Sequence, residues 1–177
     1  MLTAGLTCAP ALAQQTSTAT ASTQAVIVKP IVLSNTSDLT FGRLASAVGT
    51  VSISADLGVR SSTEPTSLIT AVGNAEAPGR ASFTVTGEPG LAYDISATPK
   101  EITLSNTESG LLTVTLTGVH VLSNSKTGEP ATVTSGVLDA ATGKDTLGIG
   151  GSLELLGTTP SGIYANAEGI ALTVNYN

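Results

Sequence analysis

The sequence has few of the residues that carry most protein chemistry. Its 177 residues include one histidine, His120, one cysteine, Cys8, and no tryptophan, and only 11% of them are charged. A zinc site needs several His or Cys ligands, so the composition excludes one. His120 lies in a strand-like alternation, and we expect it to be an ordinary strand residue. Because no nucleophile, base or metal constellation emerges, we expect no metal, no cofactor and no enzymatic activity.

Three further features are candidates for a calcium, dinucleotide or acid-pair site. Residues 139–145 carry two carboxylates around a glycine, as a calcium loop requires, but Lys144 lies inside the segment. We therefore expect a solvated hairpin loop there. Residues 148–151 are rich in glycine but lack the following helix of a dinucleotide site. Glu88 and Glu101 could form an acid pair, although nothing in the sequence places them together.

Positive charge is scarce and scattered along the chain. Seven Lys and Arg residues stand against 13 Asp and Glu residues, which gives a formal net charge of -6. No basic stripe is available to neutralise phosphates, and few aromatic rings are available to stack on bases. We therefore expect no nucleic-acid partner. No apolar run approaches the ~18 residues of a membrane-spanning helix, so we expect no transmembrane segment.

The first residues are typical of an export signal. Residues 1–13 are uncharged and apolar, and they end in Ala11-Leu12-Ala13, a small-x-small pattern that predicts cleavage between Ala13 and Gln14. Because the basic n-region is missing, we expect a truncated signal peptide or a start codon assigned too late. A buried N-terminal helix is the alternative. Cleavage would remove Cys8 and leave an exported chain without thiols.

An arm follows the predicted cleavage site. Residues 14–24 are rich in Thr, Ser and Ala and have no large apolar side chain, so they cannot fold alone. The next residues, 25–28, are apolar and precede Lys29 and Pro30. Because proline cannot donate to a strand ladder, Pro30 confines the apolar stretch to an edge or divides it into two strands.

The rest of the chain has β character. Many short runs of β-forming residues, separated by turn clusters about 8–12 residues apart, predict a sandwich or barrel. The last run alternates most clearly, with every second residue apolar from Ile170 to Tyr176, and one face should lie in a core. A weak helical period covers residues 135–141, and residues 34–38 form a predicted turn. We expect strands within residues 39–41, 50–53, 80–86, 92–97, 101–104, 111–121, 131–133, 152–156 and 169–177.

The order of several motifs resembles a known group of proteins. The motifs are Asp38-Leu39-Thr40-Phe41-Gly42, residues 83–90 (FTVTGEPG), residues 147–153 (LGIGGSL), Gly162-Ile163-Tyr164 and a terminal Leu172-Thr173-Val174-Asn175-Tyr176. Together they resemble an uncharacterised secreted bacterial domain family that is similar to subunits of chaperone–usher fimbriae, especially the archaic, spore-coat-like class. The resemblance spans nearly the whole mature chain. One departure is that many such subunits carry a disulfide, whereas the mature chain would have no Cys.

The resemblance implies an immunoglobulin-like antiparallel β-sandwich over residues 29–177 that is incomplete and is completed by a strand from a neighbouring subunit. It implies an extracellular pilus subunit that polymerises head-to-tail with copies of itself, after export through the periplasm with a chaperone and an outer-membrane usher. The candidate donor residues are Ala19, Ala21, Thr23, Ala25, Val26, Ile27 and Val28. The candidate residues flanking the acceptor groove, where a chaperone strand could also pair, are Ile170, Leu172, Val174 and Tyr176.

Two points stay open at the level of sequence. The inserted segment could be limited to residues 25–28, or the arm could be a simple linker, because Ala19, Ala21 and Thr23 are small for core-filling side chains. The whole domain could instead be a self-complete secreted sandwich that serves as an adhesion or surface module. In that case the apolar stretch of residues 25–33 would pair within its own chain.

Overall fold

The computed structural model describes residues 17–64, 67–69, 77–98, 100–122, 133–166 and 168–177. Within these residues the chain forms twelve β-strands, and each strand pair that it makes is antiparallel. The predicted all-β class and antiparallel sandwich architecture are confirmed. The strands are β1 (Val32–Ser37), β2 (Val48–Ile53), β3 (Arg60–Ser62), β4 (Ala81–Thr86), β5 (Ala92–Thr98), β6 (Glu101–Ser105), β7 (Leu111–Leu116), β8 (His120–Val121), β9 (Ser135–Val137), β10 (Lys144–Ile149), β11 (Gly151–Leu156) and β12 (Ala171–Tyr176).

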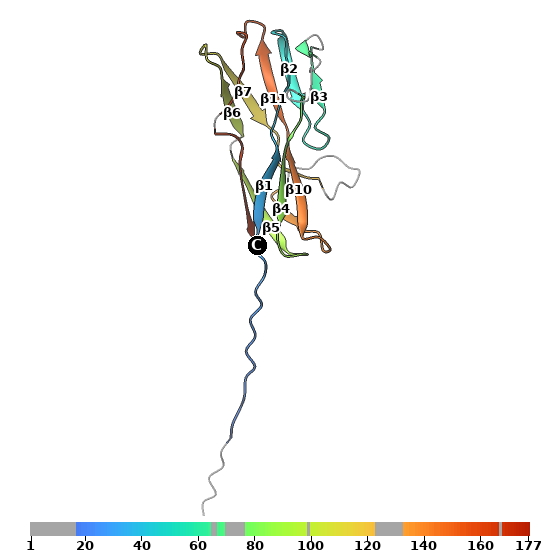
Figure 1. Ribbon diagram of the computed structural model, residues 1–177, viewed down its shortest axis with the longest axis vertical. Coiled ribbons are helices and arrows are strands. Elements are labelled where there is room, and N and C mark those ends of the chain that lie inside the picture. Colours follow the sequence, from blue (N-terminus) through green and yellow to red (C-terminus); the bar gives the residue numbers. More distant parts are fainter. Residues whose placement is uncertain (1–16, 65–66, 70–76, 99, 123–132, 167) are drawn as a thin grey trace, which may run out of the picture.

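The strands form three sheets that occupy two halves of an elongated molecule (Figure 1). In the half nearer the N-terminal arm, a four-stranded sheet of order β1-β4-β10-β8 packs against a three-stranded sheet of order β12-β5-β9. The far half contains a five-stranded sheet of order β3-β2-β11-β7-β6. Each half has its own hydrophobic core, which we call the lower core and the upper core.

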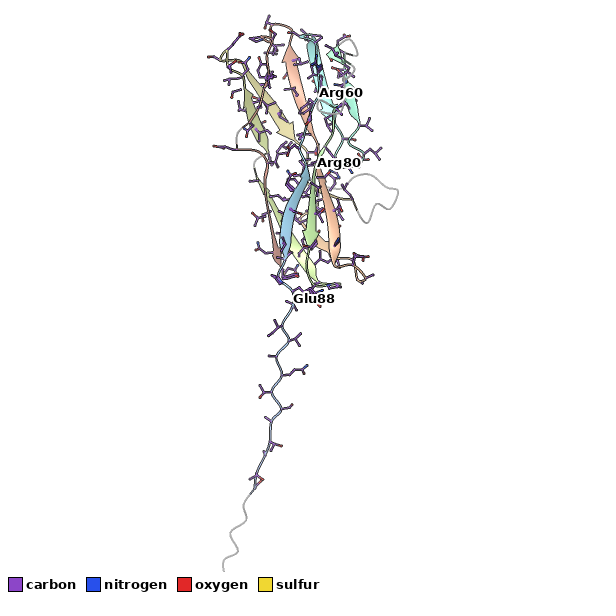
Figure 2. All side chains as sticks on the ribbon, viewed as in Figure 1. Arg60, Arg80 and Glu88 are labelled. Carbon is purple, nitrogen blue, oxygen red and sulfur yellow. The ribbon has the colours of Figure 1, made fainter. Side chains whose placement is uncertain are left out.

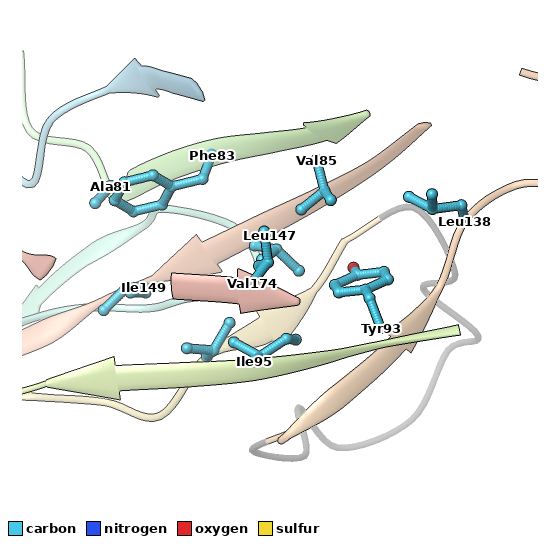
Figure 3. Close-up of a cluster of buried hydrophobic side chains, with 10 residues drawn as sticks. Ala81, Phe83, Val85, Tyr93, Ile95, Leu138, Leu147, Ile149 and Val174 are labelled. Atoms are coloured by element: carbon cyan, nitrogen blue, oxygen red, sulfur yellow. The ribbon is translucent and has the colours of Figure 1, made fainter. Parts of the chain in front are cut away.

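The lower core lies between the two facing sheets (Figure 3). The four-stranded sheet contributes Phe83 and Leu147, and the three-stranded sheet contributes Tyr93, Ile95 and Val174. The upper core covers one face of the five-stranded sheet, and the segment around Phe41 packs against it. The alternating burial along β4 and β11 follows directly from the two-residue period of a strand.

The chain passes between the halves several times, and the passage from β10 to β11 is the shortest. β10 ends at Ile149 and β11 begins at Gly151, so only Gly150 separates them. β10 lies between β4 and β8 in one sheet, and β11 lies between β2 and β7 in another. A Cβ atom on Gly150 would lie 2.1 Å from the carbonyl oxygen of Ile53. Glycine is therefore required here because two backbone segments approach each other closely where the chain changes sheets.

The clearest sequence prediction, the orientation of the last strand, is confirmed. Val174 is buried, and Ile170, Leu172 and Tyr176 are partly buried against the lower core. The intervening residues of β12 are exposed. The predicted runs at residues 50–53, 80–86, 92–97, 101–104 and 152–156 also coincide with β2, β4, β5, β6 and β11.

Other sequence predictions were wrong. The predicted turn at residues 34–38 is mostly strand β1, because Ser34, Thr36 and Ser37 donate hydroxyl hydrogen bonds to main-chain carbonyls on and beside β4. Serine and threonine are common in turns, but here their hydroxyl groups bond β1 to the segment of β4. The weak helical period at residues 135–141 covers β9 and a turn. The predicted run 111–121 is two strands, and residues 39–41 form only an isolated bridge from Thr40 to Gly79. The predicted run 131–133 lies largely outside the described residues.

One polar pair is buried inside the lower core. The hydroxyl of Tyr93, which is fully buried, donates to Oδ2 of Asp145 at 2.6 Å, and Asp145 is only 1% exposed. The other carboxylate oxygen accepts from the main-chain N–H of Thr146 at 2.8 Å. Burial, and then the bond to Asp145, raises the pKa of Tyr93 well above its ordinary value. The pair thus satisfies two polar groups that would be costly to bury alone.

Replacing Gly150 tests the close approach between the halves. We expect Gly150→Ala to lower the free energy of unfolding by about 1–3 kcal/mol, because the new methyl group overlaps the Ile53 carbonyl. Gly79→Ala is the control, since no heavy atom lies within 4 Å of its Cβ position. Urea denaturation of the two variants measures the difference, and equal midpoints would contradict this account of the crossing.

The Tyr93–Asp145 pair predicts a pH dependence of stability. Because the pKa of Tyr93 is higher in the folded than in the unfolded protein, its contribution is complete below pH ~10 and is lost as the pH rises further. At neutral pH, Tyr93→Phe should cost about 1–3 kcal/mol, since a buried carboxylate loses a donor. Above pH ~10 the gap between wild type and variant should narrow. Urea denaturation at a series of pH values checks this, and a constant gap would contradict it.

Candidate functional site

The N-terminal arm lies outside its own sandwich. Residues 17–28 form no strand, are exposed throughout, and run away from the domain in Figure 1. Ile27 is 96% exposed and Val26 is 76% exposed, and Val28 is also classed as exposed. The candidate donor residues Ala19, Ala21 and Thr23 lie in the same extended segment. The structure therefore brings none of the candidate donor residues into contact with the core of their own domain.

β1 and β12 are edge strands of the two lower sheets. Among the described residues, β1 pairs only with β4, and β12 pairs only with β5. The two strands belong to opposite sheets and contact each other at their margins. We call the line along which they face each other, without pairing, the β1–β12 seam. Unpaired main-chain groups on both sides make this seam a place where another strand can add.

The seam also lies over incompletely covered core residues. Leu33 on β1 packs against the lower core and is only partly buried. Leu172 and Tyr176 on β12 do the same from the other side. These partly buried apolar side chains continue the lower core outward on both sides of the seam. Of the predicted acceptor residues, Leu172, Val174 and Tyr176 lie on β12 and Ile170 directly precedes it; Val174 is already buried in the lower core, and the other three are partly buried against it.

A network of three hydrogen bonds, which we call the arm clamp, fixes the base of the arm. The hydroxyl of Tyr176 donates to the carbonyl oxygen of Lys29 at 2.8 Å and accepts from the main-chain N–H of Glu88 at 2.7 Å. The main-chain N–H of Lys29 donates to Oε2 of Glu88 at 3.2 Å. Glu88 lies at the base of the domain in Figure 2, where the arm begins. The clamp therefore joins the arm, the β4–β5 turn and the end of β12.

The β4–β5 turn is shaped to receive the tyrosine. A Cβ atom at Gly87 would lie 2.2 Å from the hydroxyl oxygen of Tyr176. The N–H of Gly87 donates to the carbonyl of Gly143 at 2.9 Å, which holds the turn in place. Glycine at this position lets the phenol approach the main chain of Glu88 closely enough to bond.

Sequence reasoning found Tyr176 as a core-facing residue but missed the arm clamp. A tyrosine at the end of an amphipathic strand has an apolar ring and a polar tip that needs a partner, and this is a usable signal. The partners themselves, Lys29 and Glu88, could not be identified because they are distant in sequence and all their atoms in the clamp except Glu88 Oε2 belong to the main chain. Glu88 belongs to the clamp and Glu101 begins β6 in another sheet, so the structure does not pair them as an acid pair.

The remaining catalytic and metal-binding candidates, His120, Asp139 and Asp145, have structural roles. His120 is buried at the start of β8, and burial lowers its pKa, an effect that the nearby carboxylate of Asp56 partly offsets. Asp139 accepts hydrogen bonds from Thr142 and Ala141 within its own turn, and these lower its pKa. Asp145 points into the lower core toward Tyr93, so the two carboxylates do not form a calcium loop. No group of three or more possible metal ligands occurs among the described residues.

The two arginines labelled in Figure 2 hold loops together. The guanidinium of Arg60 donates to the carbonyls of Phe41 and Ile69 at 2.9 Å each. Arg80 donates to the carbonyl of Asp56 and to the hydroxyl of Ser82. Their positive charge is therefore used for main-chain carbonyls within the fold.

The exposed face of the five-stranded sheet contains a shallow hollow of ≈ 450 Å³. Its lining consists mainly of hydroxyl and carboxylate side chains. The lining residues are Thr50, Glu101, Leu111, Leu112, Thr113, Thr115, Ser152, Glu154 and Leu156. No aromatic ring is among these residues, so the hollow lacks the stacking platform on which sugars commonly bind.

The predicted signal peptide and its cleavage site at Ala13 and Gln14 lie outside the described residues. In the part of the chain that the structure covers, no helix is both long and apolar enough to cross a bilayer.

Comparison with known proteins gives a family but no activity. No curated protein and no solved structure matches the chain. One family profile, described as Domain of unknown function (DUF4402), matches residues 31–176. The match contains every strand from β1 to β12, whereas residues 17–28 of the arm precede it. The chain therefore belongs to the DUF4402 family of domains of unknown function.

Proposed function

We propose that this protein is a structural subunit of an extracellular pilus-like filament, in which each copy donates its arm to the β1–β12 seam of the next. The observation that carries the proposal is the exposure of residues 26–28 outside their own sandwich. Strand addition would supply what both parts lack: main-chain partners for the free edges and a covered surface for the arm's apolar side chains. A head-to-tail contact of this kind does not close on itself, so it extends into a fibre.

The dimensions of arm and seam support this assignment. β1 and β12 each have six residues, so the seam is roughly 20 Å long at the rise of a strand. The extended arm over residues 17–28 can reach about 40 Å from its base. It can therefore cover the full seam of a second copy while it stays attached to its own domain.

Burial energy favours the apolar part of the arm as the inserted segment. Complete burial of a Val or Ile side chain contributes about 1.5–3 kcal/mol, so Val26 and Val28, which share one face of an extended strand, would together contribute roughly 3–6 kcal/mol. Ala19, Ala21 and Thr23 have much less apolar surface to bury. In the proposed assembly, residues 25–28 occupy about 13 Å of the seam, and the arm residues that precede them continue toward its far end.

Export and assisted assembly are part of the same proposal. Residues 1–13 direct the chain out of the cytoplasm, and the free β1 and β12 edges need protection before polymerisation because exposed edges pair with any available strand. A periplasmic chaperone that lends a strand to β12, and an outer-membrane usher that exchanges it, meet that need. Neither partner requires a catalytic group, cofactor or metal in this chain.

Substitution within the arm tests the proposal. The triple variant Val26→Ser, Ile27→Ser, Val28→Ser should abolish fibres, because the inserted side chains no longer bury apolar surface. Its free energy of unfolding should change by no more than about 0.5 kcal/mol, since these exposed residues contact nothing in their own core. Negative-stain electron microscopy and size-exclusion chromatography measure assembly, and urea denaturation measures stability.

The matched control changes the polar part of the same arm. Ala19→Ser together with Ala21→Ser should assemble like wild type, because little apolar area is lost. Fibres of undiminished length and yield from the triple variant would overturn assembly through residues 26–28. A wild-type protein that stays monomeric at every concentration, and melts cooperatively without a partner, would instead indicate a self-complete surface module.

A further inference from the structure

The arm of a donor-strand subunit can in principle fill its own seam or the seam of a second copy, and these two events compete. The arm begins at Lys29, close to one end of its own β1–β12 seam. A segment tethered by a short flexible link has an effective concentration in the millimolar range, which exceeds a micromolar concentration of free copies by about a thousandfold. Unless something prevents it, the arm would fill its own seam and no fibre would form. The following inference rests on the proposed function of the arm and asks what prevents this.

The residues at the base of the arm oppose a tight reversal. The tightest reversal that would lay the arm along its own β1 is a hairpin with Lys29 and Pro30 as the two turn residues. Proline has φ near −65°, so Pro30 cannot adopt the positive φ that type I′ and type II turns need at this position. Proline there also disfavours the type I turn, because it pushes Lys29 toward extended backbone. A three-residue loop would add Ile31 and place it in the left-handed backbone conformation, which a β-branched residue strongly disfavours.

The arm clamp adds a second barrier of a different kind. Both main-chain polar groups of Lys29 are already bonded, the N–H to Glu88 and the carbonyl to Tyr176. A reversal at Lys29 would have to break these bonds. The phenol of Tyr176 comes from β12, one of the two strands that border the seam, so the clamp spans the end of the seam at which the reversal would occur. Residues 17–28 leave the domain in the opposite direction, as Figure 1 shows.

We infer that the arm clamp and Pro30 together form a device that denies the arm to its own seam and reserves it for a second copy of this chain. Tyr176 has two roles: its ring covers the lower core, and its hydroxyl orients the arm. Glu88 and Gly87 act as positioning residues, one by bonding Lys29 and the other by leaving room for the phenol.

The test removes both barriers, which are Pro30 and the hydrogen bonds of Tyr176 in the arm clamp. Replacing Lys29-Pro30 by Asn-Gly (K29N/P30G) introduces the pair that best forms a two-residue hairpin, and adding Tyr176→Phe removes both bonds of the phenol. We expect this second triple variant, K29N/P30G/Y176F, to remain monomeric with a raised melting temperature. Its fibre yield should fall by a factor that approaches the roughly thousandfold advantage of the tethered arm. The K29N/P30G double variant, which alters only exposed residues, should show the same trend more weakly.

A second readout does not depend on fibre formation. Nitroxide labels at Thr23→Cys and Thr173→Cys, in a Cys8→Ser background diluted with unlabelled protein, report the distance from the arm to β12 within one molecule. Wild type should give long distances only, and the triple variant a new short-distance population. Two control variants should behave as wild type: K29N with Pro30 retained, and Tyr164→Phe, which removes a phenol that donates to the carbonyl of Pro160 at 3.0 Å.

The possible outcomes separate this inference from the proposed function. A short arm-to-β12 distance in wild type, or unchanged distances and fibre yield in both the triple and the K29N/P30G variants, would overturn the device. If wild type forms no fibres but the K29N/P30G/Y176F variant still gains the short distance and the higher melting temperature, the exclusion of the arm from its own seam stands and the pilus proposal fails.

Discussion

The passage of one strand through Gly150 is the constraint on which the rest of the architecture depends. β10 and β11 are interior strands of two different sheets, so the sequence from Lys144 to Leu156 orders both halves of the molecule at once. The crossing is possible only because Gly150 lets the chain meet the Ile53 carbonyl without a side chain between them. Once this path is set, β4 and β2 pair along it and each half gains a core.

The same path determines which strands are left at the margins. With β10 and β4 inside the four-stranded sheet, β1 is an outer strand, and β12 is the outer strand of the facing sheet. The two margins lie together and leave Leu33 and Leu172 partly covered. The partly covered core residues and the two free strand edges therefore occur at the same place in the molecule. This coincidence, combined with an exposed apolar arm at the same end of the domain, supports strand exchange better than a simple surface module.

Patterns local in sequence were predictable, and contacts distant in sequence were not. β12 could be identified because its apolar residues alternate over a long run, which is a property of the strand alone. The start of β1 belongs to the apolar stretch that was predicted as an edge strand, but residues 34–37 were missed because Ser34, Thr36 and Ser37 have turn-forming side chains that here bond to main-chain carbonyls of the neighbouring segment. The arm clamp joins residues 59 and 147 positions apart, partly through main-chain atoms that every residue has. Only the folded chain brings such atoms together.

An exposed apolar arm is a liability that this sequence limits by its context. A run of β-branched residues such as residues 26–28, with free main-chain groups, is prone to pair with any open strand edge. The run is short, is preceded by Thr- and Ser-rich sequence, and is followed at once by a charge at Lys29 and a strand breaker at Pro30. Lys29 and Pro30 therefore limit the length of the aggregation-prone strand, and they lie where the arm leaves the domain. A segment selected only as a linker would need neither β-branched side chains nor a fixed base, whereas a segment that pairs with a second copy needs both.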